Sequence, residues 1–382
     1  MYLAHTVPPD HMTTTADTFD NKIRTTFEQI IGVPLTDKAW AQATLPMSRS
    51  GFGLRSILRH GSAAYLASTW ASKLLLDKLN PTLYQQLSEH IKDARETFQF
   101  LSNSTMPESC VTQKTLSKKL DDFQMECNLN GAEHREKARI LATSKPHAGA
   151  WINALPLPSI NTIIPNRLFQ ISAQRWLGVP LTSTESKCMV CNKPNNNYAD
   201  HALVCGSRGD RISRHNGLRK VVAQLARNAA LNPVEEKAGI LGDAPGCRPG
   251  DVTILMWHNG EALAIDTAVT AVLQQRFINV DSPAEEYATK EKHAKYDESF
   301  AHTAHEFCAM VWKDFGAITK EGEEVIQDLG KMGADHLGYP RGVYIAHCWQ
   351  TISTELQRSN AKMILSRTLL EEHCWDDGVL GE

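Results

Sequence analysis

The chain has 382 residues, a formal net charge of −3 and 42% hydrophobic residues. This length predicts two or three domains that each bury a core, and the small net charge excludes a general attraction to nucleic acid. Nine cysteines without a regular spacing favour a reducing compartment over a disulfide framework. No run approaches the roughly 20 apolar residues that a membrane span requires. We therefore expect an intracellular protein without a membrane partner.

The N-terminal half of the sequence predicts helices. Residues 17–100 contain apolar residues at helical spacing, interrupted by loops such as Gly51-Phe52-Gly53. Residues 115–145 are charged, with Leu116 and Leu120 at helical spacing, which favours an amphipathic helical connector. Another helical patch follows over residues 166–177.

Three cysteines and a histidine have the spacing of a zinc site. Two residues separate Cys188 from Cys191, nine separate Cys191 from His201, and three separate His201 from Cys205. A turn that supplies two thiolates and a short helical turn that supplies the other pair can complete a tetrahedral shell around a structural zinc ion. The polar loop between them has too few apolar residues to fold without the ion. The alternative is a loop of free cysteines with an unrelated histidine.

A basic segment surrounds this cluster. Residues 131–230 contain fourteen Lys and Arg against five Asp and Glu, a balance that suits a phosphodiester substrate. The alternative is an ordinary solvated helix face. His215 and Asn216 could also approach nucleic acid, although helix capping or hydrogen bonding in the core is the stronger interpretation. The basic residues that follow the cysteines are Arg208, Arg211, Arg214, Arg219, Lys220 and Arg227.

The C-terminal half alternates helices and strands in the order of a small α/β domain. Asn259-Gly260 predicts a hairpin because both residues can adopt positive φ. The expected strands cover residues 252–257, 262–269 and 307–315, and the expected helices cover residues 211–230, 283–304, 320–332 and 345–370.

Two aspartates mark a candidate catalytic centre. Asp251 precedes the first of these strands, and Asp266 interrupts the second, where a lone ionised carboxylate is costly to bury. Two carboxylates on adjacent strands suffice to hold Mg²⁺ or Mn²⁺, which can activate water for phosphodiester hydrolysis. The alternative for each acid is an exposed aspartate at a strand end that accepts a hydrogen bond.

Neighbouring charged residues could complete this centre. A lysine could orient the attacking water, and Lys292 and Lys295 are the candidates, although with Lys290 they also form an ordinary charged helix face. Glu235 and Glu236, at the end of the preceding helix, could add a third carboxylate. A solvated helix terminus is the alternative for these glutamates.

Together these motifs resemble the endonuclease region of site-specific non-LTR retrotransposons, whose nuclease belongs to the restriction-enzyme-like PD-(D/E)xK class. In that family a zinc knuckle precedes a Lys/Arg-Pro-Asp motif, a second acid, and a lysine followed by a tyrosine. Here Gly250 stands between the proline and the aspartate, and Ala268 stands at the usual position of the lysine. The matching residues after the knuckle are Arg248, Pro249, Asp251, Asp266, Lys292 and Tyr296.

The resemblance extends to the N-terminal half. Residues 51–56 and 63–68 look like the segment after the palm of such a reverse transcriptase, including its thumb. No Tyr/Phe-x-Asp-Asp turn occurs in the chain, so polymerisation is not expected. The resemblance implies a multidomain protein of class α plus α/β: a helical thumb-like remnant (1–100), a helical linker (101–183), a zinc knuckle (184–207), a restriction-endonuclease-like core (208–335), and a C-terminal helix and tail (336–382).

The function that this resemblance implies is a Mg²⁺- or Mn²⁺-dependent endonuclease that nicks a DNA strand in the nucleus, with the element's RNA as a further partner. The alternative is a zinc-organised nucleic-acid-binding protein with an inactive nuclease core. The catalytic residues that we expect are Asp251, Asp266, Lys292 and Tyr296, from the resemblance, with Glu236 as a third carboxylate from its position in the sequence. The nucleic-acid contacts that we expect, mainly from the distribution of charge, are Arg208, Arg211, Arg214, Arg219, Lys220 and Arg248.

Overall fold

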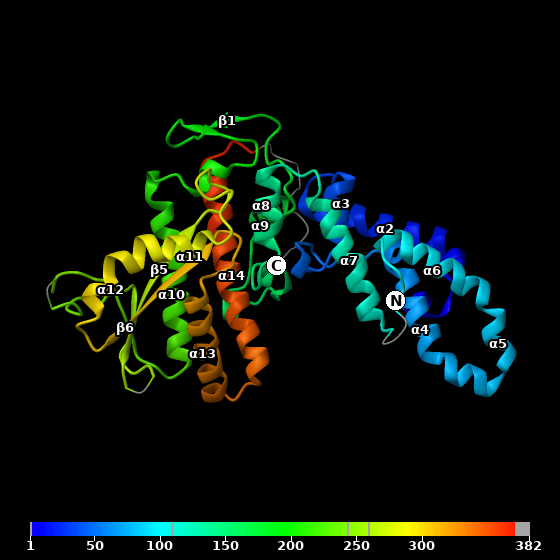
Figure 1. Ribbon diagram of the computed structural model, residues 1–382. Helices are drawn as coiled ribbons and strands as arrows, with labels where there is room; N and C mark the ends of the chain where they lie inside the picture. Colours follow the sequence, from blue (N-terminus) through cyan, green and yellow to red (C-terminus); the bar gives the residue numbers. More distant parts are fainter. Residues whose placement is uncertain (1, 108–110, 243, 259, 371–382) are drawn as a thin grey trace. The chain divides into compact units, whose positions relative to one another are not determined.

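A computed structural model describes residues 2–107, 111–242, 244–258 and 260–370 (Figure 1). The chain divides into two compact units, unit 1 (Met1–Ile140) and unit 2 (Leu141–Glu382). Unit 1 is helical, and unit 2 combines helices with two small sheets. The predicted combination of α and α/β structure is confirmed at this level, whereas the five named segments stay predictions. Within the described ranges, no helix is long and apolar enough to cross a membrane.

Unit 1 buries the helix that the sequence assigns to a connector. Leu116 and Leu120 of α7 are fully buried and pack against α4 and α6. Gly131, at φ +72°, lies between α7 and a separate helix, α8. The expected connector is therefore two helices. The first of them, α7, belongs to the core of unit 1, because α4 and α6 cover its apolar side. The helices from Tyr2 to Thr143 are α1 (Tyr2–Thr6), α2 (Pro9–Ile31), α3 (Asp37–Thr44), α4 (Ile57–Leu79), α5 (Pro81–Gln86), α6 (Ser88–Ser102), α7 (Gln113–Leu129) and α8 (His134–Thr143).

A four-stranded sheet in the order β3-β4-β5-β6 forms the centre of unit 2. Strands β3, β4 and β5 are antiparallel, whereas β5 and β6 are parallel, so the chain crosses over between them through α11 and α12. The elements of unit 2 are α9 (Asn166–Leu177), β1 (Ser186–Lys187), β2 (Pro194–Asn195), α10 (Asp210–Asn228), β3 (Pro233–Glu235), β4 (Val252–Ile254), β5 (Ala262–Thr270), α11 (Pro283–Tyr287), α12 (Ala294–Phe300), β6 (His305–Lys313), α13 (Lys320–Leu337) and α14 (Arg341–Leu365).

The sheet differs from its prediction at one edge. Strand β3 was not expected, because three residues that include a proline carry no alternation signal. Strand β4 ends at Ile254 rather than at residue 257. Gly260 has φ +83°, as the hairpin prediction requires, while Asn259 and the tail at 371–382 lie outside the described residues.

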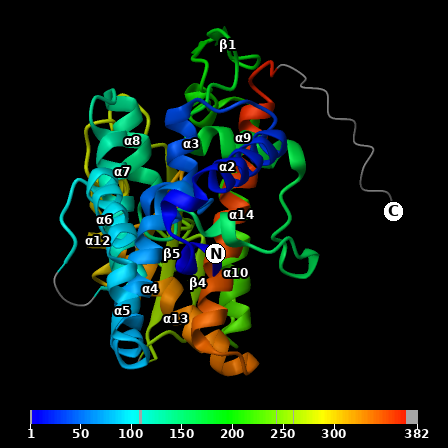
Figure 2. The ribbon, with the colours of Figure 1, turned by 90° about the vertical axis from the view of Figure 1, so that its right-hand side faces the viewer.

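Helices cover both faces of this sheet. Leu263 and Ile265 of β5 point into a core shared with α10, α13 and α14, which lie together in Figure 2. Ala264 and Ala268 face the other way and pack against the segment of α11 and α12. Figure 1 shows these two helices beside β5 and β6. Successive side chains of a strand alternate between faces. Asp266 therefore lies on the α11 and α12 face, and the next residue, Thr267, lies on the α10 face.

Candidate functional site

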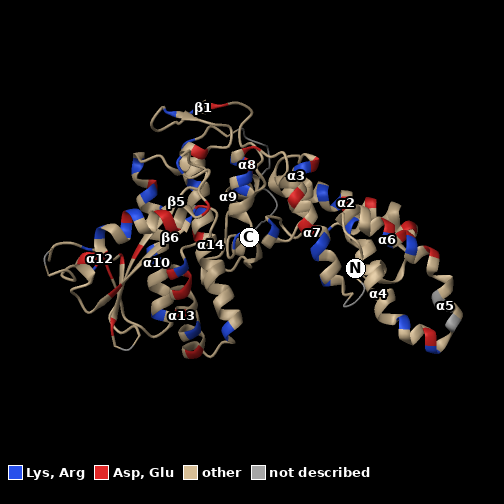
Figure 3. Cartoon of the chain, in the orientation of Figure 1, with Lys and Arg blue, Asp and Glu red and all other residues tan. Residues whose placement is uncertain are grey.

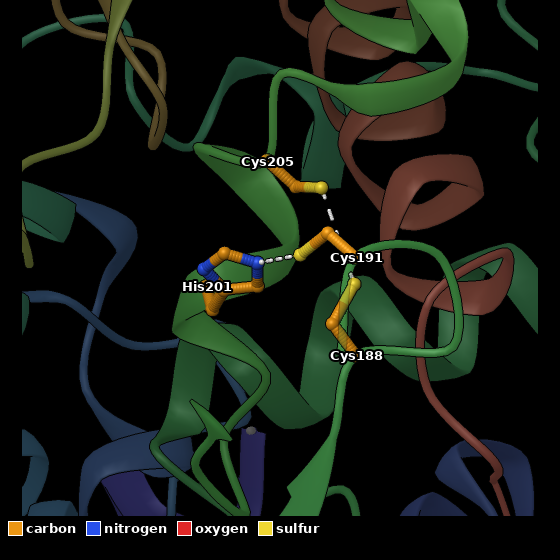
Figure 4. A group of neighbouring side chains, drawn as sticks. All are labelled: Cys188, Cys191, His201 and Cys205. Carbon is orange, nitrogen blue, oxygen red and sulfur yellow. Dashed lines mark hydrogen bonds between the residues drawn. The ribbon is translucent and has the colours of Figure 1, made fainter. Parts of the chain in front are cut away.

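The four predicted zinc ligands lie close together (Figure 4). The Nε2 of His201 is 3.0 Å from the Sγ of Cys191, and the Sγ atoms of Cys188 and Cys205 are 4.0 Å apart. Cys188 and Cys191 lie in the turn between β1 and β2, and the 3₁₀ turn Asp200–Leu203 carries His201. Zn–S bonds of about 2.3 Å in a tetrahedral shell place two sulfur atoms about 3.8 Å apart. The cluster could therefore hold a zinc ion.

Arg367 connects this cluster to the start of α10. Its fully buried side chain pairs with Asp210 and donates a hydrogen bond of 2.6 Å to the backbone oxygen of Ser207. Burial raises the pKa of Cys205, but hydrogen bonds from the backbone of Ser207 and from Arg367 outweigh it and lower this pKa to about 6. At neutral pH such a cysteine is mainly thiolate, the form that binds zinc. The zinc cluster and α10 thus share one hydrogen-bond network.

Asp251 is held between α10 and β5. Its Oδ1 accepts a hydrogen bond from His215 Nε2 at 3.0 Å, and its Oδ2 accepts bonds from the backbone N–H and the hydroxyl of Thr267 at 2.6 and 2.7 Å. The preceding residue, Gly250, lies tightly against β5, where a Cβ would be 3.1 Å from the Cβ of Ala264. Burial raises the pKa of Asp251, but these hydrogen bonds outweigh it and keep the pKa below its usual value. Asp251 is therefore ionised at neutral pH.

Asp266 bonds to the opposite helix layer. Its Oδ2 accepts a hydrogen bond of 2.8 Å from Lys292 Nζ, and the two side chains are 10% and 19% exposed. Burial raises the pKa of Asp266 and outweighs the effect of Lys292. Burial lowers the pKa of Lys292, but the charge of Asp266 outweighs it and raises that pKa. Lys292 lies in a π-helical turn, Ala288–His293, a feature frequent at functional sites.

The strand register places the two aspartates side by side in the sheet. Val252 of β4 pairs with Ile265 of β5 in antiparallel order. Asp251 and Asp266 are therefore the next residues beyond this pair on neighbouring strands, and the charge of Asp251 adds to the rise in the pKa of Asp266. The register thus makes the two aspartates neighbours along the backbone, whereas their carboxylates bond to opposite helix layers, Asp251 to His215 of α10 and Asp266 to Lys292.

A cavity of about 330 Å³ opens beside these residues. His215 and Thr267 line it from the α10 side, and Tyr287 and Lys292 line it from the α11 side. Arg211, an exposed residue of α10, also lines the cavity. Its ionisable lining is basic, although two carboxylates lie next to it, and this combination suits a phosphate group together with a cation.

The other predicted catalytic residues make contacts elsewhere. Tyr296 packs in a buried cluster on the α12 side, and its hydroxyl accepts a hydrogen bond of 2.7 Å from Lys295 Nζ. Glu236 follows β3 rather than ending a helix, and its side chain pairs with Arg219 and Arg248. In the described part of the chain, neither Tyr296 nor Glu236 hydrogen-bonds the side chain of either aspartate. Glu236 is thus engaged by arginines.

Figure 3 marks the Lys and Arg residues that recur along α10. These predicted nucleic-acid contacts differ in exposure. Arg214 is 3% exposed and donates a hydrogen bond of 2.8 Å to Asn360 of α14. Its place among surface contacts is a wrong prediction, because this side of α10 packs against α14. Arg219 and Arg248 are bound by Glu236. The contacts that remain exposed without a carboxylate partner among the described residues are Arg208, Arg211 and Lys220.

His215 has a larger part in this site than the sequence indicates. It bonds Asp251 through one ring nitrogen, and its other nitrogen lies 3.3 Å from the Thr267 hydroxyl. The bond to Asp251 is the main cause that raises the pKa of His215. His215 and Asp251 are 36 positions apart in the sequence and meet only in the folded chain. A hydrogen bond of His215 was therefore predicted, but Asp251 was not predicted as its partner.

Comparison of the sequence with protein-family models finds no match, and comparison with curated proteins finds no significant match.

Proposed function

We propose that unit 2 is a divalent-metal-dependent endonuclease that cuts one strand of DNA, with Asp251 and Asp266 as metal ligands. The observation that carries the proposal is the 2.8 Å contact between Lys292 and Asp266, next to Asp251 and beside a cavity lined by basic side chains. Metal-assisted phosphodiester hydrolysis needs carboxylates for the cation and a positive side chain for the developing charge. The retrotransposon-like order of these motifs in the sequence also supports it.

The donor set suits Mg²⁺ or Mn²⁺. Magnesium is bound by one or two carboxylates together with waters and substrate oxygens. A carboxylate offers roughly four acceptor positions, and Asp251 uses three of them. Asp266 uses one for Lys292, and no hydrogen bond from a described residue reaches its Oδ1. Both carboxylates therefore retain capacity for an ion, which when bound would polarise the phosphoryl oxygen and acidify a water.

The surrounding residues have separate roles in this proposal. His215 and Thr267 hold the Asp251 carboxylate in one orientation, so that its free acceptor position stays directed to the ion. Lys292 partly neutralises Asp266 and would stabilise negative charge on the phosphate as it reacts. Arg211 would bind a non-bridging phosphate oxygen at the mouth of the cavity.

Nicking of supercoiled plasmid tests this function. The wild-type chain should nick in Mg²⁺ and not in excess chelator, and Asp266→Asn and Asp251→Asn should each lower the nicking rate ~100-fold or more. Both variants should retain DNA binding. Glu306→Gln, which removes an exposed carboxylate from the neighbouring strand β6, is the matched control and should nick normally. Nicking by the aspartate variants at the wild-type rate would remove the catalytic assignment.

A second candidate function is nucleic-acid binding without cleavage. The observation that favours it is the hydrogen bonding of both Asp251 oxygens by protein donors, which also suits a purely structural aspartate. Exposed Arg208, Arg211 and Lys220 would then contact phosphates beside the zinc cluster. Binding should weaken steeply with salt, and Arg211→Glu should reduce the salt slope by about one. Such binding with no nicking in Mg²⁺ or Mn²⁺ would select this alternative.

A further inference from the structure

We propose that unit 1 contains a second zinc-class metal site, formed by Asp10, His11 and His90. Asp10 and His11 lie in the first turn of α2, and His90 lies in the first turn of α6. One ligand atom from each residue lies within 4.8 Å of the other two. The site is separate from the Cys188 cluster and does not depend on the nuclease proposal.

The spacing of these atoms matches a metal coordination shell. Asp10 Oδ2 lies 3.4 Å from His11 Nε2 and 3.3 Å from His90 Nδ1. In a tetrahedral shell with Zn–N and Zn–O bonds of about 2.05 Å, two ligand atoms are about 3.3 Å apart. The two imidazole rings meet edge to face with centroids 4.9 Å apart, so both rings can direct a nitrogen to a shared point beside Asp10.

The surroundings of Asp10 and His90 are the second observation. The Nδ1 of His90 is buried, and it faces the Asp10 carboxylate at 3.3 Å without making a hydrogen bond to it. No lysine or arginine of the described ranges pairs with Asp10. A cation held between the Asp10 carboxylate and the Nδ1 of His90 would bind both atoms directly.

The ligand chemistry selects the class of ion. Two imidazole nitrogens and one carboxylate oxygen suit Zn²⁺, with related first-row ions as competitors. Three protein ligands leave the fourth position open for water. Because the ligands come from α2 and α6, the ion would join two helices of unit 1 and stabilise that unit in proportion to its occupancy.

Zinc stoichiometry of the full chain tests the site. Purified chain is stripped by dialysis against a chelator, reloaded with excess Zn²⁺ and weighed by native mass spectrometry. We expect two zinc ions per wild-type chain and one in His90→Ala and in His11→Ala. His336→Ala, which removes an exposed helical histidine of α13, is the control and should retain two.

Thermal unfolding with and without zinc distinguishes the loss of a metal site from a variant that folds poorly. Added zinc should raise the unfolding temperature of unit 1 in the wild-type chain and leave that of His90→Ala unchanged, while far-UV circular dichroism confirms that both are equally helical before loading. A wild-type chain that binds one zinc ion at saturation would overturn the proposal. Two zinc ions retained by His90→Ala would overturn it as well.

Discussion

Replacing Lys292 with methionine should destabilise unit 2, because it leaves Asp266 buried without its partner. The two side chains are 19% and 10% exposed and lie 2.8 Å apart. Removing one member of a buried ion pair costs about 3–5 kcal/mol, and we expect about 3 kcal/mol here because this pair keeps some exposure to solvent. In a unit of this size each kcal/mol lowers Tm by roughly 2–4 °C, so the unit 2 transition should fall by about 6–12 °C in scanning calorimetry.

A double variant, Lys292→Met with Asp266→Asn, separates the unpaired charge from the lost packing. Asparagine is not ionised, so the double variant should recover most of the lost stability and still fail to nick DNA. Acid should also rescue the single variant. Burial raises the pKa of Asp266, and a carboxyl with a raised pKa is costly only when ionised, so the cost disappears as pH falls below that pKa. Two results would contradict this prediction: a Tm of Lys292→Met at pH 7 equal to that of the wild type, or a double variant whose Tm is as low as that of Lys292→Met.

Three further predictions concern the scaffold around the site. Arg175→Met should cost about 3–5 kcal/mol in urea unfolding, because Arg175 and Asp314 form an ion pair whose side chains are 4% and 0% exposed; an unchanged midpoint would contradict it. Burial lowers the pKa of His293, but Glu321 and Asp297 outweigh it and raise this pKa above 6.5. The stabilisation that charged His293 provides through Glu321 and Asp297 is therefore complete below pH 6.5 and is lost as pH rises through the raised pKa. His293→Asn should accordingly lower Tm more at pH 6 than at pH 9. Removing zinc with a chelator should accelerate hydrogen exchange at the start of α10, through Arg367; equal exchange with and without zinc would disprove that coupling.

Local signals in the sequence predicted much of unit 2. The apolar runs of β5 and β6 and the periodic helices α10 and α13 lie close to their expected positions. The zinc cluster was also predictable, because its four ligands lie within 18 consecutive residues, from Cys188 to Cys205. The spacing of residues left Lys292 and Lys295 as alternatives beside Asp266, and only the resemblance favoured Lys292, which contacts Asp266 in the structure.

Features that depend on distant partners were not predictable. Arg214 was predicted to be an exposed basic residue of α10. It is buried because α14 packs against it, and its partner Asn360 lies 146 positions later in the chain. The position of Leu116 in the core of unit 1 likewise depends on how α4 and α6 pack. Periodicity indicates that a helix has an apolar side, whereas the neighbour that covers this side is determined by tertiary packing.

The most direct test of the account is Mn²⁺ binding to the zinc-loaded chain, measured by electron paramagnetic resonance. If Asp251 and Asp266 share one cation, the wild-type chain should bind one Mn²⁺ at this site, and Asp251→Asn and Asp266→Asn should each weaken that binding by at least tenfold. Glu306→Gln should bind as the wild type does. Equal Mn²⁺ binding by all four chains would contradict the claim that these two aspartates form a metal site.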